Sequence, residues 1–376
     1  MAEKWYYFNG KSLEYNSKKV VFKLPVGTIR VRTNDGNPPE SVQSEIYGSA
    51  TYDSVTRVDG TTDIFDVYKS GTSAHNVLYR CMNVVEVIDA NLTGFTDLSH
   101  MFRDCRALAT VALFDTSSVT NMEGMFYDCY SLTTVPLFDT SSVQYMGWMF
   151  NGCERLTSVP LFDTSSVQYM GGMFIGCERL TSVPLFDTSS VRNMGGMFYN
   201  CVALTSVPLF DTSNATRMEL MFSRCSSLTS VPLFDTSNAT HIEGMFGGCS
   251  SLTSVPFFDT SSAVYTSEMF SRCSSLTSVP LFDTSSVTSM TEMFYNCVAL
   301  TSVPLFDTSS VLSMTNMLNG CTAVESGALA LYTQASSQAT PPVAYTDAFK
   351  NCGANTTTGA AELAQIPASW GGLAAG

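Results

Sequence analysis

The chain has little histidine, few positive charges and no long apolar run, and each shortage excludes a class of protein. Three histidines in 376 residues leave little room for imidazole-based catalysis or a histidine-rich metal site. Lysine and arginine number 19 against 33 aspartates and glutamates, whereas a nucleic-acid binder needs clustered cations to displace phosphate counterions. The apolar runs fall far short of the ~20 residues that a membrane span requires. We therefore expect neither nucleic-acid binding nor membrane insertion.

An export signal is also missing from the N-terminal residues. Residues 1–10 hold one early lysine, but no continuous apolar core and no small-residue cleavage site. The chain is nevertheless 45% apolar and only 14% charged, a composition typical of folded proteins. We expect a folded protein that is made in a cytoplasm and does not use the ordinary export pathway.

The twelve cysteines mark an internal repeat. Eleven of them, from Cys81 to Cys321, follow one another at intervals of 24 residues, and Cys352 follows after 31. A fixed period of this size is typical of a solenoid. Neighbouring coils would bring successive cysteines within disulfide range, but cysteine is among the most buried residue types and no Cys-x-x-Cys zinc motif occurs. We therefore predict a buried column of reduced thiols.

Within each period the motif Met-Phe-x-x-Cys-x-x-Leu-Thr-Ser-Val-Pro-Leu-Phe-Asp-Thr-Ser-Ser-Val-x-x-Met returns. In the coil around Cys177, the alternation at Val183–Leu185 predicts a short strand. The spacing of three between Val191, Met194 and Met197 predicts a 3₁₀ or helical turn on the opposite wall. Because no coil can bury its apolar wall alone, the coils must stack on one another.

The motif resembles a known family of repeats. Phe-x-x-Cys-x-x-Leu, with Thr-Ser and a hydrophobic-Pro step, resembles the BspA-like leucine-rich repeats of bacterial surface proteins. Asp-Thr-Ser-Ser-Val-x-x-Met-x-x-Met-Phe is similar to a variant in tandem-repeat surface lipoproteins and some phage virion proteins. The resemblance implies a β-rich solenoid of the leucine-rich-repeat type, a right-handed stack with one short parallel strand per 24-residue coil. It also implies adhesion or recognition at a surface, without naming a ligand.

Three regions follow from the pattern. Residues 1–74 alternate as strands near Val20–Leu24, Thr28–Thr33 and Asp63–Tyr68, and predict a small N-terminal β domain that anchors or oligomerises the chain. Residues 75–325 form the solenoid. Residues 326–376 lose the strand motif and predict a C-terminal cap, with a short helix that opens near Ser326 and ends near Gln338.

One aspartate recurs in nine successive coils, and like charges ~5 Å apart repel one another. Two accounts remain open: each carboxylate accepts bonds from the following Thr and Ser in an Asx-type turn, or the column holds Ca²⁺ or another cation. We favour the turn, because no Asp-rich calcium loop is present. The column comprises Asp115, Asp139, Asp163, Asp187, Asp211, Asp235, Asp259, Asp283 and Asp307.

The sequence offers little for catalysis. A triad needs a histidine that is oriented by an acid, but we expect His75, His100 and His241 to be isolated, and no Gly-x-Ser-x-Gly elbow occurs. We therefore expect a protein that is not an enzyme and has no cofactor.

Side chains that vary between otherwise near-identical coils are the candidate binding residues. Since the framework positions hardly change, the varying side chains should face outward, and Tyr, Trp and Arg are typical of recognition surfaces. Neutral drift at solvated positions is the alternative for any one of them. The candidates are Tyr127, Tyr145, Trp148, Tyr169, Arg192, Tyr199, Arg217, Arg224, His241, Tyr265, Arg272 and Tyr295.

These observations favour a bacteriophage virion structural protein, a tail or head appendage or fibre that recognises the host surface. The N-terminal domain would dock on other virion proteins, and the solenoid would bind a bacterial surface protein or glycan. A homo-oligomer is compatible with this role. The alternatives are a bacterial cell-surface adhesin and an intracellular protein-binding scaffold.

Overall fold

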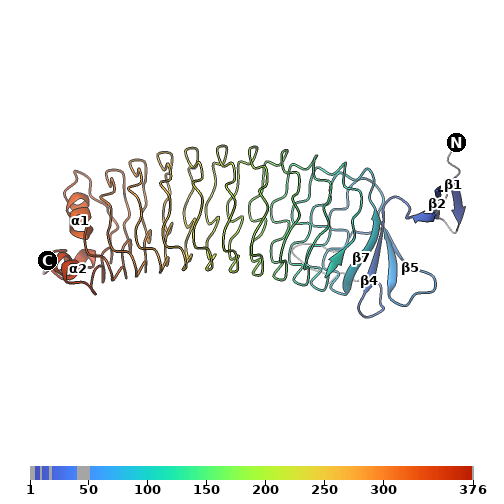
Figure 1. Ribbon diagram of the computed structural model, residues 1–376, viewed down its shortest axis with the longest axis horizontal. Coiled ribbons are helices and arrows are strands. Elements are labelled where there is room, and N and C mark those ends of the chain that lie inside the picture. Colours follow the sequence, from blue (N-terminus) through green and yellow to red (C-terminus); the bar gives the residue numbers. More distant parts are fainter. Residues whose placement is uncertain (1–4, 9–10, 17–18, 40–50, 375–376) are drawn as a thin grey trace. The chain divides into compact units, whose positions relative to one another are not determined.

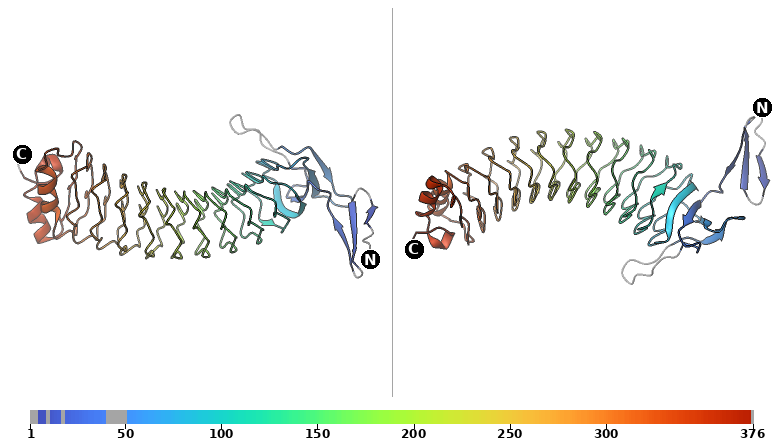
Figure 2. Two further views of the ribbon diagram at one scale, coloured as in Figure 1. Left: turned by 90° about the horizontal axis from the view of Figure 1, so that it is seen from above. Right: turned by 60° about the horizontal axis from the view of Figure 1, so that its bottom comes forward.

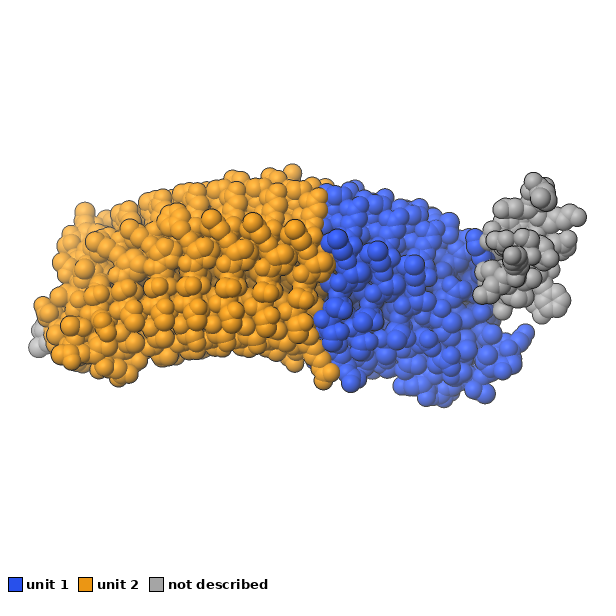
Figure 3. Space-filling model, in the orientation of Figure 1, with its two compact units in different colours: residues 1–167 blue, residues 168–376 orange. Residues whose placement is uncertain are grey.

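The computed structural model describes the backbone of residues 5–8, 11–16, 19–39 and 51–374, and the side chains from residue 23 onward within these ranges. The chain divides into two compact units, residues 1–167 and 168–376 (Figure 3). Within both, consecutive coils lie side by side in chain order (Figure 1).

Unit 1 begins with two sheets. Strands β1, β2 and β3 form an antiparallel three-stranded sheet, and a second sheet has the order β5-β6-β4-β7-β8 (Figure 1). The strands expected around residues 20–24, 28–33 and 63–68 are confirmed as β3, β4 and β6. The bounds are β1 Trp5–Phe8, β2 Lys11–Asn16, β3 Lys19–Lys23, β4 Thr28–Thr33, β5 Ser54–Arg57, β6 Ile64–Tyr68, β7 Val84–Asn91 and β8 Thr110–Val111.

The second sheet joins the N-terminal strands to the first coils. Strand β7 pairs antiparallel with β4 on one side and parallel with β8 on the other. The sheet therefore continues across the expected boundary at residues 74 and 75, so the first coil has no exposed edge on the β4 side.

The strand expected in every coil at Val-x-Leu forms only where proline is absent. Between β7 and β8 the Ala112 amide donates to the Val87 carbonyl at 2.9 Å. One coil later Pro136 holds the position of Ala112, and proline has no N–H to donate. In the described coils from Pro136 onward the segment is not a strand, so the prediction of one strand per coil was wrong there.

A tight turn replaces that strand. The Phe186 amide donates to the Pro184 carbonyl two residues earlier, at 3.0 Å, which closes a three-residue turn centred on Leu185. The same bond recurs at Phe210 and Phe234. The leucine at the centre of each turn points away from the core and is exposed.

The opposite wall holds the backbone ladder between coils. Met194, Gly196, Phe198 and Asn200 each donate an amide to a carbonyl of the following coil, at 2.7–2.9 Å. Between them, Met197 donates three residues back to the Met194 carbonyl at 3.1 Å, and Tyr199 likewise to the Gly196 carbonyl at 3.0 Å. The predicted turn is therefore confirmed. It does not continue as a helix because Gly196 and Asn200 both have φ of +61°.

The core is a set of columns that repeat with the coils. The Phe198 and Phe222 rings stack with centroids 5.6 Å apart and planes 3° apart. All twelve cysteines are buried free thiols, which confirms the predicted column. The Cys201 thiol donates to the Phe174 carbonyl at 3.0 Å, so it satisfies a buried acceptor as well as filling space.

The C-terminal end of unit 2 contains the expected helix, a second helix and a 3₁₀ turn. Helix α1, Ala328–Ser336, is confirmed, and α2, Thr357–Leu363, lies beside it (Figure 2). The Glu362 carboxylate of α2 accepts from the Leu329 amide at 3.1 Å. A 3₁₀ turn, η1 Ala368–Trp370, then buries Trp370. Over the described residues, every helix is too short or too polar to cross a membrane.

Candidate binding site: a notch on the variable face

The varying side chains lie on the wall that carries the backbone ladder. All twelve candidate residues are exposed or half-buried. Each coil places two residues in the left-handed region, such as Leu220 with φ of +56° and Arg224 with φ of +63°, and three of the candidates, Trp148, Arg224 and Arg272, hold such positions. A residue in the left-handed region interrupts the right-handed turn, so its side chain projects outward from the wall.

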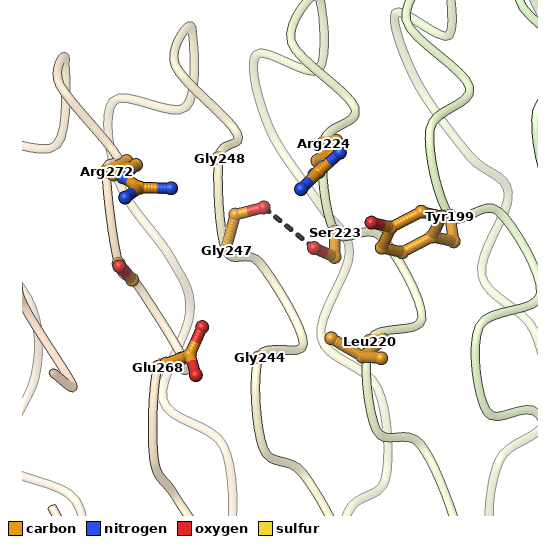
Figure 4. Close-up of a pocket in the computed structure, with 10 residues that line it drawn as sticks. Tyr199, Leu220, Ser223, Arg224, Gly244, Gly247, Gly248, Glu268 and Arg272 are labelled. Atoms are coloured by element: carbon orange, nitrogen blue, oxygen red, sulfur yellow. Dashed lines mark hydrogen bonds between the residues drawn. The ribbon is translucent and has the colours of Figure 1, made fainter. Parts of the chain in front are cut away.

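One coil lacks side chains at three outward positions. Gly244, Gly247 and Gly248 stand where the preceding coil has Leu220, Ser223 and Arg224. The missing side chains leave a notch of about 280 Å³ between two fuller coils (Figure 4). It is lined by Tyr199, Leu220, Ser223, Arg224, Gly244, Gly247, Gly248, Glu268, Ser271 and Arg272.

Two arginines stand on either side of the notch (Figure 4). The Arg224 guanidinium lies 5.4 Å from the centre of the Tyr199 ring, and that of Arg272 lies 5.6 Å from the Tyr295 ring. The arrangement is symmetrical about the glycine coil, because each arginine stacks on a tyrosine of the coil on its outer side. Such cation–π contacts hold a guanidinium in place while leaving its N–H groups free to donate.

These two guanidiniums differ from others on the same wall. Arg217 pairs with Glu219 of its own coil at 2.7 Å, and Arg106 pairs with Asp104 at 3.1 Å. Among the described residues neither Arg224 nor Arg272 has an ion-pair partner. Two exposed cations in an acidic chain are therefore available to an anion from outside.

The remaining polar groups of the notch have distinct roles. The Ser223 hydroxyl donates to the Gly247 carbonyl at 3.0 Å, which fixes the floor (Figure 4). The amides of Gly247 and Gly248 are both used within the wall, so the backbone offers no donor. The exposed Glu268 carboxylate can accept bonds from hydroxyl groups. The notch thus combines two cations, one acceptor and an aromatic rim.

Other candidate residues form smaller groups outside the notch. The rings of His241 and Tyr265 lie 5.2 Å apart, and the Arg103 guanidinium lies 4.3 Å over the Tyr127 ring. Arg192 is exposed in a different column. The others, which do not line the notch, are Tyr145 and Trp148 in unit 1 and Tyr169 and Arg217 in unit 2.

Two of the histidines are not isolated, contrary to the prediction. His75 and His100 lie with ring centroids 5.8 Å apart. His75 Nδ1 is 2.8 Å from Ser99 Oγ, and that hydroxyl donates to Asp97 Oδ1 at 2.6 Å. A catalytic triad places the imidazole between the hydroxyl and the carboxylate, whereas here the hydroxyl lies between the other two. Burial, followed by the charges of Arg103 and His75, lowers the pKa of His100 to about 4.

The aspartate column forms Asx-type turns, as expected. Asp187 Oδ1 accepts from the Ser189 hydroxyl at 2.6 Å and from its amide at 3.1 Å. These two bonds hold the pKa of Asp187 below its ordinary value, and the same pattern lowers that of Asp235. Within the described ranges, no three His, Cys, Asp or Glu side chains lie close enough together to hold a metal ion.

Comparison with known proteins places the repeat in a family. The model described as "Mycoplasma protein of unknown function, DUF285" matches residues 96–207, 178–277 and 229–332, which together cover more than half of the chain. The chain belongs to this family. No curated protein matches it. Membership of DUF285 establishes a repeat protein and leaves its activity open.

Two solved structures are similar to the DUF285 chain. One is a leucine-rich repeat protein from Eubacterium ventriosum, with 17% identity and a TM-score of 0.36 over 65% of this chain and 78% of that one. The other is the TLR13–ssRNA13 complex, with 11% identity and a TM-score of 0.24 over 65% of this chain and 44% of that one. Likenesses this weak carry no argument about what the chain binds.

Sequence reasoning found the arginines and tyrosines but missed the residues that make the hollow. Leu220 and Glu268 line the notch at positions where several other coils have glycine. The signal was present in Gly244, Gly247 and Gly248, because this is the one coil of the repeat with glycine at all three positions. A search for large, varying side chains does not detect these glycines.

Proposed function

We propose that this chain is a non-catalytic recognition protein, a right-handed BspA-like leucine-rich-repeat solenoid whose variable face binds an acidic saccharide. The observation that carries the proposal is the notch, where two guanidiniums without ion-pair partners flank a coil stripped of side chains. A carboxylate, phosphate or sulfate on the saccharide would lie between Arg224 and Arg272, since planar guanidiniums bind such groups by paired N–H donors.

The rest of the notch suits the neutral part of a saccharide. Glu268 can accept bonds from sugar hydroxyls, and the Tyr199 ring offers a flat apolar face beside Arg224. The chain's net charge of −14 repels anions that lack a specific site, which favours selective over general anion binding.

In this proposal the protein works as a virion component of a bacteriophage. Its N-terminal domain docks on other virion proteins, and the solenoid presents the notch to a glycan or protein of the bacterial surface. The support is the combination of a recognition surface with an N-terminal region of different composition. The same geometry would serve a bacterial cell-surface adhesin, which the bacterial genus in the family's description favours.

The binding proposal is tested with a defined probe. We would titrate the full chain with oligogalacturonate, an acidic saccharide, and with the neutral galactose oligomer of equal length, by isothermal calorimetry. We expect the acidic oligomer to bind, and the double variant Arg224→Gln, Arg272→Gln to lose about tenfold or more in affinity. Gly247→Tyr should also block binding, since the repeat carries tyrosine at this position two coils away on either side, at Tyr199 and Tyr295.

A matched control is Arg192→Gln, which removes an exposed arginine of unit 2 outside the notch. It should bind like the unmodified chain. Equal binding of the neutral oligomer, or an equal loss in the Arg192 variant, would overturn the notch as the site.

The location is tested separately. Immunogold electron microscopy of the source cells and of any particles they release should place the label on particles. Label on the cell envelope would replace the virion role with the adhesin, and label confined to the cytosol would contradict both.

A further inference from the structure

A row of exposed apolar side chains lies on the wall opposite the notch. In nine coils the residue just before the buried phenylalanine that precedes the column aspartate is 52–61% exposed, and eight of the nine are leucine. We name this row the leucine ridge. Its members are Leu185, Leu209, Leu233, Phe257, Leu281 and Leu305, all in unit 2; Leu113, Leu137 and Leu161 hold the same position in the coils of unit 1.

The fold does not require leucine at these exposed positions. The tight turn needs the carbonyl of Pro184 and the amide of Phe186, and any residue could occupy position 185 between them. Exposed polar positions of the repeat are of two kinds: some vary from coil to coil, as at Gln144 and Arg192, and others recur, as at Asp187. At the ridge the single exchange, Phe257, replaces one large apolar side chain by another. Contiguous exposed apolar side chains of this kind mark interaction surfaces.

A row of carboxylates accompanies the ridge. Each ridge residue is followed two positions later by an aspartate of the column, with a buried phenylalanine between them. In unit 2 a groove of about 320 Å³ is lined by Leu233 and Phe257 together with Asp235 and Asp259. The Asx-type turns orient these carboxylates and hold the pKa of Asp235 low, so the Asp235 carboxylate stays charged at neutral pH.

The charges select among the possible occupants. A second copy of the chain would bring two carboxylate rows together, and like charges at close range repel. A bilayer with anionic headgroups would be repelled for the same reason. In a protein segment with apolar residues flanked by lysine or arginine, the apolar residues would pack on the leucine ridge and the cations would pair with the aspartate row.

We propose that the leucine ridge and its aspartate row form a docking surface for a cationic amphipathic segment of a partner protein. This surface is separate from the notch and goes beyond the saccharide site. Apolar contacts on the ridge supply affinity, and the carboxylates orient the partner and reject acidic surfaces.

The experiment uses three synthetic peptides of equal length and fluorescence anisotropy with the full chain. One peptide has a leucine face flanked by lysine, the second replaces lysine by glutamine, and the third replaces leucine by serine. We expect the leucine–lysine peptide to bind at least about tenfold more tightly than either of the others. Its affinity should fall as salt is raised, because the charge pairs are exposed.

Variants of the chain locate the surface. The triple variant Leu209→Ser, Leu233→Ser, Phe257→Ser should lose about tenfold in affinity for that peptide, with an unchanged melting temperature because all three side chains are exposed. Leu312→Ser is the matched control, since Leu312 and Leu209 are both 59% exposed and Leu312 lies outside the ridge. It should bind normally.

Charge is tested by Asp211→Asn with Asp235→Asn, which keeps an oxygen for the Asx turn and removes the carboxylates. Affinity should fall and its salt dependence should flatten, whereas Glu325→Gln, an exposed acid outside the row, should change neither. Three results would overturn the proposal: equal binding of the glutamine peptide, an equal loss in Leu312→Ser, or a dimer in solution that the ridge variants dissolve.

Discussion

At the scale of single residues, the cysteine column shows how a reactive side chain becomes part of a framework. The Cys225 and Cys249 thiols are buried and donate to carbonyls of the preceding coils at 3.1 Å. Burial raises the pKa of the Cys225 thiol to about 12 and that of Cys249 well above its ordinary value. The thiolate is the reactive form, so these groups are chemically quiet at neutral pH.

Thiol labelling tests this directly. We expect iodoacetamide at pH 8 to modify none of the twelve cysteines of the native chain within the time that labels a free peptide thiol completely. In guanidinium chloride all twelve should react, as counted by intact mass. Rapid labelling of several cysteines in the native protein would contradict the buried column.

At the scale of elements, one residue type decides whether a coil has a strand. Ala112 donates the bond to Val87 that pairs β7 with β8, and Pro136 cannot repeat it. Ala112→Pro should therefore leave the Val87 carbonyl without its partner and cost about 1–3 kcal/mol in the free energy of unfolding, measured by urea.

Pro136→Ala is the matched exchange in the next coil. It breaks no hydrogen bond, because proline has no amide to donate, and its effect should stay within about 0.5 kcal/mol. A chain with Ala112→Pro as stable as the unmodified one would show that the β7–β8 pairing is not needed.

The elements that the sequence predicted are those with a local cause. Periodicity placed the coils, alternation placed β4 and β6, and the loss of the motif after Cys321 placed α1 and the cap. The prediction of a strand at Val-Pro-Leu was wrong because it relied on the resemblance to leucine-rich repeats and did not take into account the proline in the segment. The notch was missed because it consists of absent side chains, and the contact between His75 and His100 arises only when coils stack.

At the scale of the whole molecule, the aspartate column makes stability depend on pH. Hydrogen bonds from serine hydroxyls and amides lower the pKa of Asp115, Asp187, Asp235 and Asp283 in the folded state. Because the folded pKa lies below the unfolded value of about 3.9, these groups stabilise the fold above that pH. Their contribution is lost as the pH falls through the folded pKa.

We expect the melting temperature to fall between about pH 4 and pH 2.5, beyond what general acid destabilisation gives. The double variant Asp187→Asn, Asp235→Asn keeps the turn but does not titrate, so its decline over this range should be shallower. Glu325→Gln, outside the column, should decline like the unmodified chain. Parallel curves for all three proteins would remove the column as the cause.

The two walls of unit 2 also differ in how they would carry a mechanical load. Between the coils of Cys201 and Cys225 the notch wall has amide bonds from Met194, Gly196, Phe198 and Asn200 to the later coil, and from Thr216 and Arg217 back to the Arg192 carbonyl. Beside the ridge, these coils are joined by side chains: the Thr212 hydroxyl donates to the Asp235 carbonyl at 2.6 Å, and the Asn238 side-chain amide donates to the Ser213 carbonyl at 2.7 Å. Tension along the stack would therefore separate the coils first beside the ridge, while the notch wall kept its length. A partner that pulled on the ridge would bend these coils open before it disturbed the spacing of Arg224 and Arg272.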